Sequence, residues 1–323
     1  MVALGRMRRL WLSLVFAAGL LGPVPVASAE TRFPAASAIV HDPSDGKKVY
    51  VRTTFGLLAT RDNGDSWRWI CDQAIGAAAG EDPSYLVTAT GTLLAGTSSG
   101  ITASRDGGCT FGGVAMGTRA VDLAARAGGE ILGLSSIPPK GGSTGHDNHL
   151  LVSTDDGRSF APSGGPIDPT LALASLKLSP SDPARLYASG VRGEGERREA
   201  EVLVSYDAGM SWAARKLELT GGESGALVVA VDPKNADRVY VRTSGSGDTP
   251  TRLVVSDDGG KTWKKAFDAP SPIGAAALTE DGARVIVGAR DGVSSSPTNA
   301  FAFTRGSQAE TQCLAPTGST LWA

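Results

Sequence analysis

The chain has 323 residues, a mass of 33.0 kDa and a formal net charge of −2. Its 41% hydrophobic content excludes a disordered chain, and its one long apolar run, at the N-terminus, excludes a protein with several membrane spans. The 42 glycines and 18 prolines exceed average usage, so we expect many tight turns and short strands rather than long helices.

Residues 1–29 have the pattern of an export signal. Arg6, Arg8 and Arg9 precede an apolar stretch, Leu10–Leu21, that is too short to span a bilayer comfortably, and Ala27-Ser28-Ala29 is typical of a cleavage site. A single membrane anchor and a twin-arginine signal stay open as alternatives. Cleavage leaves a mildly acidic chain. We therefore expect a secreted, periplasmic or cell-surface protein with no stable membrane span and no nucleic-acid partner.

Five octets with the pattern [S/T]-x-D-x-G-x-[S/T]-[W/F] follow along the chain, about 50 residues apart. Such a period suits one four-stranded blade of a β-propeller per repeat. The Asp, Gly and aromatic residues that define the octets are Asp62, Gly64, Trp67, Asp106, Gly108, Phe111, Asp155, Gly157, Phe160, Asp207, Gly209, Trp212, Asp258, Gly260 and Trp263.

The chemistry of each octet is that of a tight turn. The glycine supplies a positive φ, the Asp carboxylate accepts hydrogen bonds within the turn, and the aromatic side chain is free to enter an apolar seam between blades. We expect all five octets to be structural. A calcium loop is excluded because no octet has alternating carboxylates closed by a Glu at the twelfth position.

The octets resemble Asp-boxes, the bacterial neuraminidase repeats of sialidases, xyloglucanases, sortilin-type receptors and a photosystem II assembly factor. The resemblance covers residues 35–312. It implies an all-β propeller of four-stranded antiparallel blades, in which the octet turn joins the third and fourth strands and faces away from the ligand site.

Two strand-like segments precede each octet, beginning with residues 36–41 and 48–53, and a sixth pair occurs at 275–279 and 284–288. Tyr50, Tyr187 and Tyr240 fall at equivalent second-strand positions, so we expect them in the core. Residues 30–312 then form six blades, the last without an octet Asp, and 313–323 begin an incomplete seventh. Either six blades close with 313–323 as a tail, or the ring is built for seven blades. We expect the second, with Leu314 and Leu321 facing the inter-blade seam.

Residues near the expected ligand face are the candidates for binding. The loops between second and third strands are longer in blades 3 to 6 (138–148, 193–200, 244–250 and 292–299), which indicates a binding face unless these loops only tolerate insertion. Arg52 and Arg242 occupy matching second-strand ends, where they would form part of an anion site or remain exposed arginines. His146 and His149 suit a metal, but no third ligand is evident, so we expect neither metal nor cofactor.

We expect a binding or scaffold protein for an unknown extracellular protein or glycan, with a glycoside hydrolase of sialidase or xyloglucanase type as the alternative. Arg32-Phe33-Pro34 is similar to the arginine–isoleucine–proline motif of sialidases, with Phe in the middle. Sialidase chemistry also needs a Tyr with a Glu partner, and xyloglucanase chemistry needs two opposed carboxylates. The candidates for these roles, none of them specific, are Tyr85, Tyr206, Asp122, Glu81 and Asp82.

Three cysteines in an exported chain are an odd number. Cys71 lies in the predicted outer strand of blade 1 and Cys109 in the octet turn of blade 2. Because adjacent blades bring these regions together, we predict a Cys71–Cys109 disulfide, with three separate thiols as the alternative. Cys313 would remain unpaired.

Overall fold

The computed structural model describes residues 34–141, 145–318 and 320–323. The description below concerns the unit Phe33–Ala323, called the propeller unit. The predicted export signal at 1–29 and the Arg32-Phe33 pair lie outside the described residues. No helix within the described ranges is long and apolar enough to cross a membrane.

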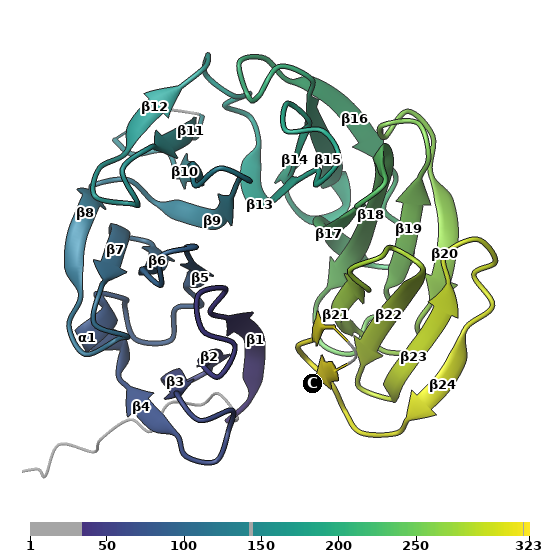
Figure 1. The fold of residues 1–323 in the computed structure, drawn as a ribbon. Coiled ribbons are helices and arrows are strands. Elements are labelled where there is room, and N and C mark those ends of the chain that lie inside the picture. The colour runs from purple at the N-terminus through teal and green to yellow at the C-terminus, as the bar shows by residue number, and fades with distance from the viewer. Residues whose placement is uncertain (1–33, 142–144, 319) are drawn as a thin grey trace, which may run out of the picture. The chain divides into compact units, whose positions relative to one another are not determined.

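The propeller unit is a six-bladed β-propeller with a partial seventh sheet (Figure 1). Each blade is a four-stranded antiparallel sheet whose strands follow chain order from the channel outward. The first three blades are β1 (Ala36–His41), β2 (Val49–Thr53), β3 (Gly56–Thr60), β4 (Arg68–Ile70); β5 (Ser84–Val87), β6 (Leu93–Thr97), β7 (Gly100–Ser104), β8 (Gly112–Met116); and β9 (Ala120–Ala125), β10 (Ile131–Ile137), β11 (Asp147–Ser153), β12 (Ala161–Ser163).

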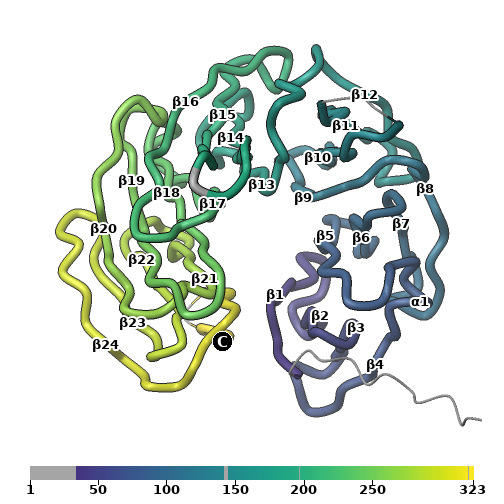
Figure 2. Tube along the Cα trace, turned by 180° about the vertical axis from the view of Figure 1, so that it is seen from behind, coloured from purple at the N-terminus to yellow at the C-terminus, as the bar shows by residue number. Residues whose placement is uncertain are grey.

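The remaining blades repeat this order, and Figure 2 shows from behind how successive blades follow one another. They comprise β13 (Ala172–Leu178), β14 (Leu186–Arg192), β15 (Glu199–Ser205), β16 (Ala213–Leu217); β17 (Glu223–Asp232), β18 (Asn235–Gly245), β19 (Arg252–Ser256), β20 (Lys264–Asp268); and β21 (Ile273–Leu278), β22 (Arg284–Ala289), β23 (Gly292–Pro297), β24 (Thr304–Ser307). A short helix, α1 (Asp72–Ile75), and a 3-10 turn, η1 (Gly195–Arg197), lie in connections.

The core consists of five apolar seams, each built from two adjacent blades. Tyr50, Tyr187 and Tyr240 are at most 2% exposed, which confirms their predicted place in the core. The first strands of all six blades line a central cavity of about 320 Å³, together with Cys313 and Leu314. The segment after the sixth blade therefore reaches the channel as the inner strands do.

The octets are the turns between third and fourth strands, as predicted. In the first of them, the Asp62 carboxylate accepts hydrogen bonds from the Thr60 hydroxyl (2.7 Å) and the Ser66 amide (2.9 Å). The hydroxyls of Ser66 and Thr60 lower the pKa of Asp62 to about 2. The other four octets repeat this pattern of bonds around Asp106, Asp155, Asp207 and Asp258.

The octet aromatic residues of blades 2 to 5 pack into the seam with the preceding blade, as predicted for Phe111, Phe160, Trp212 and Trp263. Trp67 of blade 1 differs, because it is 41% exposed. Its preceding neighbour is the two-stranded sheet of β25 (Ala315–Thr317) and β26 (Thr320–Trp322). The position of Trp67 thus reflects the incomplete seventh sheet.

This terminal hairpin contacts both ends of the ring. The Gly318 amide donates to Glu280 Oε1 of blade 6 (3.0 Å), and the Trp322 indole packs against His41 of blade 1. Leu314 lines the channel, but Leu321 is 39% exposed, so the prediction that Leu321 faces the seam is wrong. The next residue, Trp322, makes that contact because adjacent strand residues point to opposite faces.

The predicted Cys71–Cys109 disulfide is not formed, and all three cysteines are free thiols. The Cys109 Sγ accepts hydrogen bonds from Arg68 Nη1 (3.0 Å) and Arg61 Nη2 (3.7 Å). Cys71 lies one residue before α1, at its N-cap. The Cys109 thiol therefore contacts arginine side chains of blade 1, and not the Cys71 thiol that the prediction paired with it.

Candidate functional site

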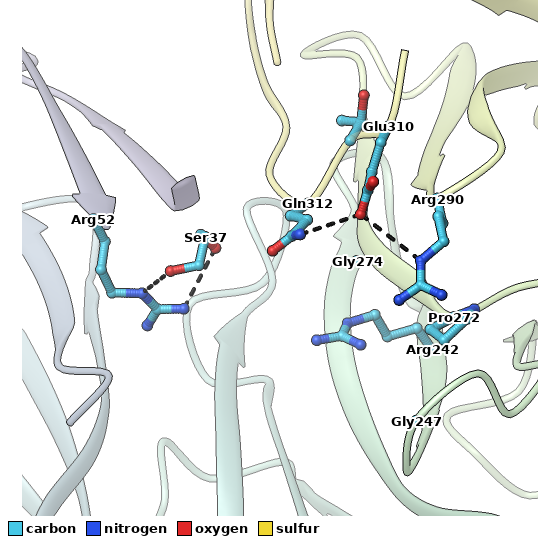
Figure 3. Close-up of a pocket in the computed structure, with 10 residues that line it drawn as sticks. Ser37, Arg52, Arg242, Gly247, Pro272, Gly274, Arg290, Glu310 and Gln312 are labelled. Atoms are coloured by element: carbon cyan, nitrogen blue, oxygen red, sulfur yellow. Dashed lines mark hydrogen bonds and ion pairs between the residues drawn. The ribbon is translucent and has the colours of Figure 1, made fainter. Parts of the chain in front are cut away.

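A pocket of about 270 Å³ opens at the end of the propeller away from the octet turns. Its walls come from the start of β1, the ends of β2 and β18, and the connector after β24. Three arginines line it, namely Arg52, Arg242 and Arg290, and we call it the arginine pocket (Figure 3). The sequence predicted matching positions for Arg52 and Arg242 at second-strand ends. The fold brings both side chains into a single cavity.

Arg52 enters the pocket from blade 1 and is braced by neutral groups. Its Nε donates to the Ser37 hydroxyl (2.8 Å), Nη2 to the Ser37 carbonyl (3.4 Å) and Nη1 to the Pro83 carbonyl (3.0 Å). No carboxylate of the described residues forms an ion pair with it. The guanidinium is thus fixed in direction, and no carboxylate of the described ranges pairs with its charge.

Arg242 approaches from blade 5, on the opposite side of the pocket (Figure 3). Its Nη1 donates to the Ile273 carbonyl (2.9 Å), and within the described part of the chain it too has no carboxylate partner. Burial, followed by repulsion from Arg52, lowers the pKa of Arg242 to about 10. It still carries its proton at neutral pH, so two positive charges converge on one partly enclosed space.

Arg290 differs from these two, because carboxylates balance its charge. It pairs with Asp248 and lies 3.8 Å from Glu310 Oε1. Glu310 in turn accepts a hydrogen bond from the Gln312 amide (3.4 Å). The pocket therefore combines two guanidinium groups that face it from opposite sides, those of Arg52 and Arg242, with a polar cluster of Arg290, Glu310 and Gln312.

A second cavity, of about 670 Å³, shares Arg290, Glu310, Thr311 and Gln312 with the arginine pocket. Its remaining walls are the residues just before β1 and Cys313 with Ala323. The two cavities together offer room for a ligand with an anionic group at one end and a larger, mostly polar body at the other.

The predicted histidine pair does not join this site. His149 lies in β11 and its Nε2 is 2.6 Å from Asp147 Oδ1, whereas the His146 amide donates to the Pro169 carbonyl (2.7 Å). Neither residue lines the arginine pocket. Across the described ranges, no group of three His, Cys, Asp or Glu side chains is arranged to hold a metal ion.

The candidate hydrolase carboxylates are engaged in structural contacts. Asp122 accepts hydrogen bonds from the Leu176 amide (2.8 Å) and from Lys177 (3.1 Å). Glu81 accepts from the amide of Ala78 (2.9 Å) and the hydroxyl of Ser98 (3.0 Å). Neither lies with Glu310 in the arginine pocket, and Asp82 does not line it either.

The two candidate tyrosines also lie elsewhere. Tyr85 packs against the seam of blades 1 and 2, where burial strongly raises the pKa of its hydroxyl. Tyr206 is in an octet, at the opposite end of the blade, under the guanidinium of Arg185 (4.0 Å from the ring centroid). The structure therefore brings neither tyrosine to the arginine pocket.

Sequence reasoning missed Arg290, Glu310 and Gln312. They belong to blade 6 and its connector, where no octet marks the third and fourth strands. The predicted long loop at 292–299 is also wrong, since Gly292–Pro297 form β23 and a tight turn puts Arg290 beside the pocket.

Comparisons with known proteins agree with this architecture. A family model described as BNR/Asp-box repeat matches residues 254–265, which include the fifth octet. No curated protein matches the sequence at a significant level.

Among solved structures, similar folds include an ancestral GH74 enzyme (TM-score 0.59, 15% identity, covering 80% of this chain and 36% of that one). A protein from Lactobacillus plantarum gives a TM-score of 0.58 at 12% identity, covering 86% of each chain. A Hadza microbial sialidase gives 0.51 at 14% identity, covering 84% of this chain and 70% of that one. At these identities the likeness is one of fold, and this chain spans little more than a third of the GH74 enzyme.

Proposed function

We propose that this chain, which belongs to the Asp-box β-propellers, is a binding protein that takes a small anionic group into the arginine pocket. The observation that supports this most strongly is the pair Arg52 and Arg242, whose guanidinium groups line one pocket without a carboxylate partner in the described chain. A carboxylate, sulfate or phosphate would supply the missing counter-charge.

The geometry favours an acidic sugar or a similar ligand over a bare ion. Arginine binds carboxylates through paired N–H donors, and both side chains keep donors that no acceptor among the described residues uses. Glu310, Gln312 and Thr311 beside them provide acceptors and donors for hydroxyl groups. The neighbouring cavity gives space for the rest of the ligand.

Calorimetric titration with glucuronate tests this proposal, with glucose as the uncharged control. We expect glucuronate alone to bind, more weakly as salt is added. Arg242→Gln should lower the affinity by about tenfold or more, since a charge-assisted contact is lost. Arg284→Gln is the matched control, because Arg284 lies at the octet end of blade 6 and bonds to Ser295. Equal binding of glucose, or full binding by Arg242→Gln at an unchanged melting temperature, would contradict the proposal.

A glycoside hydrolase of sialidase or xyloglucanase type is the second candidate. The observation in its favour is that Glu310 places one carboxylate among the three arginines of the pocket. Incubating the same preparation with a fluorogenic sialoside and with xyloglucan decides between the two. Turnover that Glu310→Gln abolishes would establish the hydrolase, whereas binding without turnover supports the binding protein.

The proposal includes export. Residues 1–29 would direct the chain out of the cytoplasm and be removed after Ala29. Sequencing the N-terminus of the protein recovered from its native host tests this, with Glu30 as the expected first residue.

A further inference from the structure

Arg52 and Arg242 line two adjoining cavities. Besides the arginine pocket, both border the central cavity of about 320 Å³, as does Ser37. The two cavities therefore meet at the two guanidinium groups. Cavities that bind drug-sized ligands measure about 300–1,000 Å³, so the arginine pocket of about 270 Å³ reaches that size only together with the central cavity. A ligand at the two arginines thus has room on both sides of them.

The other charged residues of these cavities have partners of opposite charge. In the central cavity Lys177 Nζ lies 3.1 Å from Asp122 Oδ2, and in the arginine pocket carboxylates balance Arg290. Arg52 and Arg242 form no ion pair with a carboxylate of the described ranges. Two positive charges therefore lack a counter-charge in the described part of the chain, and a ligand with a single carboxylate would balance only one of them.

The two guanidinium groups are fixed in direction on opposite sides of the pocket (Figure 3). Ser37 and Pro83 accept three hydrogen bonds from Arg52, and the Ile273 carbonyl accepts one from Arg242. Because an arginine has five N–H groups, Arg52 keeps two and Arg242 keeps four that no acceptor among the described residues uses. A bidentate pair with a carboxylate needs two such donors. Each arginine can therefore bind a carboxylate of its own.

The charges of these two arginines also act on each other. Repulsion from Arg52 is the second cause, after burial, that lowers the pKa of Arg242 to about 10. The two charges are therefore close enough to destabilise each other in the protein alone. A ligand that brings one anionic group to each guanidinium removes this repulsion, whereas one carboxylate bound at Arg242 leaves Arg52 without a partner of opposite charge.

We propose that the arginine pocket takes a polyhydroxylated ligand with two carboxylates, one bound by Arg52 and the other by Arg242. This inference rests on the proposed function and makes the class of ligand more specific. Glu310 and Gln312, which line the same pocket, supply acceptors and donors for the hydroxyl groups between the two carboxylates. Two sources share this chemistry, namely a free sugar diacid and two consecutive uronic acid units of an acidic polysaccharide.

Calorimetric titration at pH 8 with matched six-carbon ligands tests this inference. Glucuronate has one carboxylate and glucarate has two, and we expect glucarate to bind about tenfold or more tightly than glucuronate, with a steeper loss of affinity as salt is added. Glucose 6-phosphate carries two negative charges on a single group at this pH and should bind less tightly than glucarate. Digalacturonate tests the second source. Tighter binding of digalacturonate than of glucarate assigns the polysaccharide, and the reverse order assigns the free diacid.

Arg52→Gln removes the partner of the second carboxylate. In this variant we expect the affinities for glucarate and glucuronate to agree within about threefold, because only Arg242 remains to bind a carboxylate. The glucuronate binding that persists shows that the pocket is still folded. Arg284→Gln, at the octet end of blade 6, is the matched control and should keep the full advantage of glucarate.

The outcomes separate this inference from the proposed function. If neither glucuronate nor a diacid binds, both are overturned. If glucuronate binds but neither glucarate nor digalacturonate binds more tightly, only the inference is overturned. It is also overturned if glucose 6-phosphate binds as tightly as glucarate, because one dianionic group would then serve both arginines. An advantage of glucarate that survives Arg52→Gln and is lost in Arg290→Gln would assign the second carboxylate to Arg290 instead.

Discussion

The Trp322 indole and the His41 imidazole pack in a T-shaped arrangement, with ring centroids 5.5 Å apart and the two planes inclined at 73°. His41 is the last residue of β1 and Trp322 the last of β26, so this contact joins the first blade to the partial seventh sheet. The His41 Nε2 is buried and has no hydrogen-bond partner among the described residues. Burial lowers the pKa of His41 below its usual value.

This contact predicts a pH dependence of stability. Because the unfolded chain binds a proton at His41 more readily than the folded one, the free energy of unfolding should be level above pH about 6.5 and fall as the pH drops below it. Urea denaturation between pH 7.5 and pH 5, read by tryptophan fluorescence, measures this. His41→Gln should flatten the curve, whereas His146→Gln should leave it unchanged. An identical slope in His41→Gln would show that other groups cause the dependence.

The octet carboxylates predict a second, separable effect. Asp207 accepts hydrogen bonds from the Ser205 hydroxyl (2.8 Å) and the Ser211 amide (2.9 Å), and Asp207→Ala leaves both donors without this acceptor. We expect the melting temperature to fall by a few degrees. Glucuronate affinity per folded molecule should not change, because the turn lies at the end of the blade opposite the arginine pocket. Lost binding at an unchanged melting temperature would assign Asp207 a ligand role.

The octets and the second-strand tyrosines could be predicted because their signals are local. A turn of eight residues fixes its own hydrogen bonds, and alternation along a strand fixes which side chain is buried. Asp62 with Ser66 and the buried Tyr50 follow from such patterns.

The arginine pocket depends on contacts distant in sequence. Arg52 and Arg242 belong to blades 1 and 5, and only the closure of the ring directs both into one space. Blade 6 has no octet to mark its third and fourth strands, so Arg290 and Glu310 could not be placed. The predicted disulfide failed for a similar reason, since the direction of the Cys109 side chain depends on Arg68 of the neighbouring blade.

Backbone conformation in the fourth octet predicts a stabilising substitution. Ala208 has φ of 62°, a left-handed conformation that is costly for a residue with a Cβ, and Gly107 and Gly259 occupy the equivalent positions of other octets. Ala208→Gly should raise the free energy of unfolding by about 0.5–1 kcal/mol, after allowing for the greater freedom of glycine in the unfolded chain. Ala214→Gly, in β16, is the control and should be destabilising. A loss of stability in Ala208→Gly would mean that the Cβ makes packing contacts worth more than the strain.

A buried ion pair within blade 5 gives the largest expected effect. Glu223, whose side chain is 1% exposed, accepts from Arg252 Nε (2.9 Å) and Nη2 (2.6 Å). Burial alone would raise the pKa of Glu223, but hydrogen bonds from Arg252 and Thr243 hold it below the usual value. Arg252→Met leaves the carboxylate buried without its cation, and we expect the free energy of unfolding at pH 7 to fall by about 3 kcal/mol.

The double variant Glu223→Gln/Arg252→Met separates loss of the pair from loss of packing. Because no buried charge remains, it should recover a large part of the stability lost in Arg252→Met, as a urea denaturation cycle of the four proteins would measure. The Arg252→Met defect should also shrink as the pH falls toward 4, where Glu223 without its partner takes up a proton. A double variant no more stable than Arg252→Met would show that the arginine acts through its packing and through its hydrogen bond to the Glu218 carbonyl (2.9 Å), rather than through its charge.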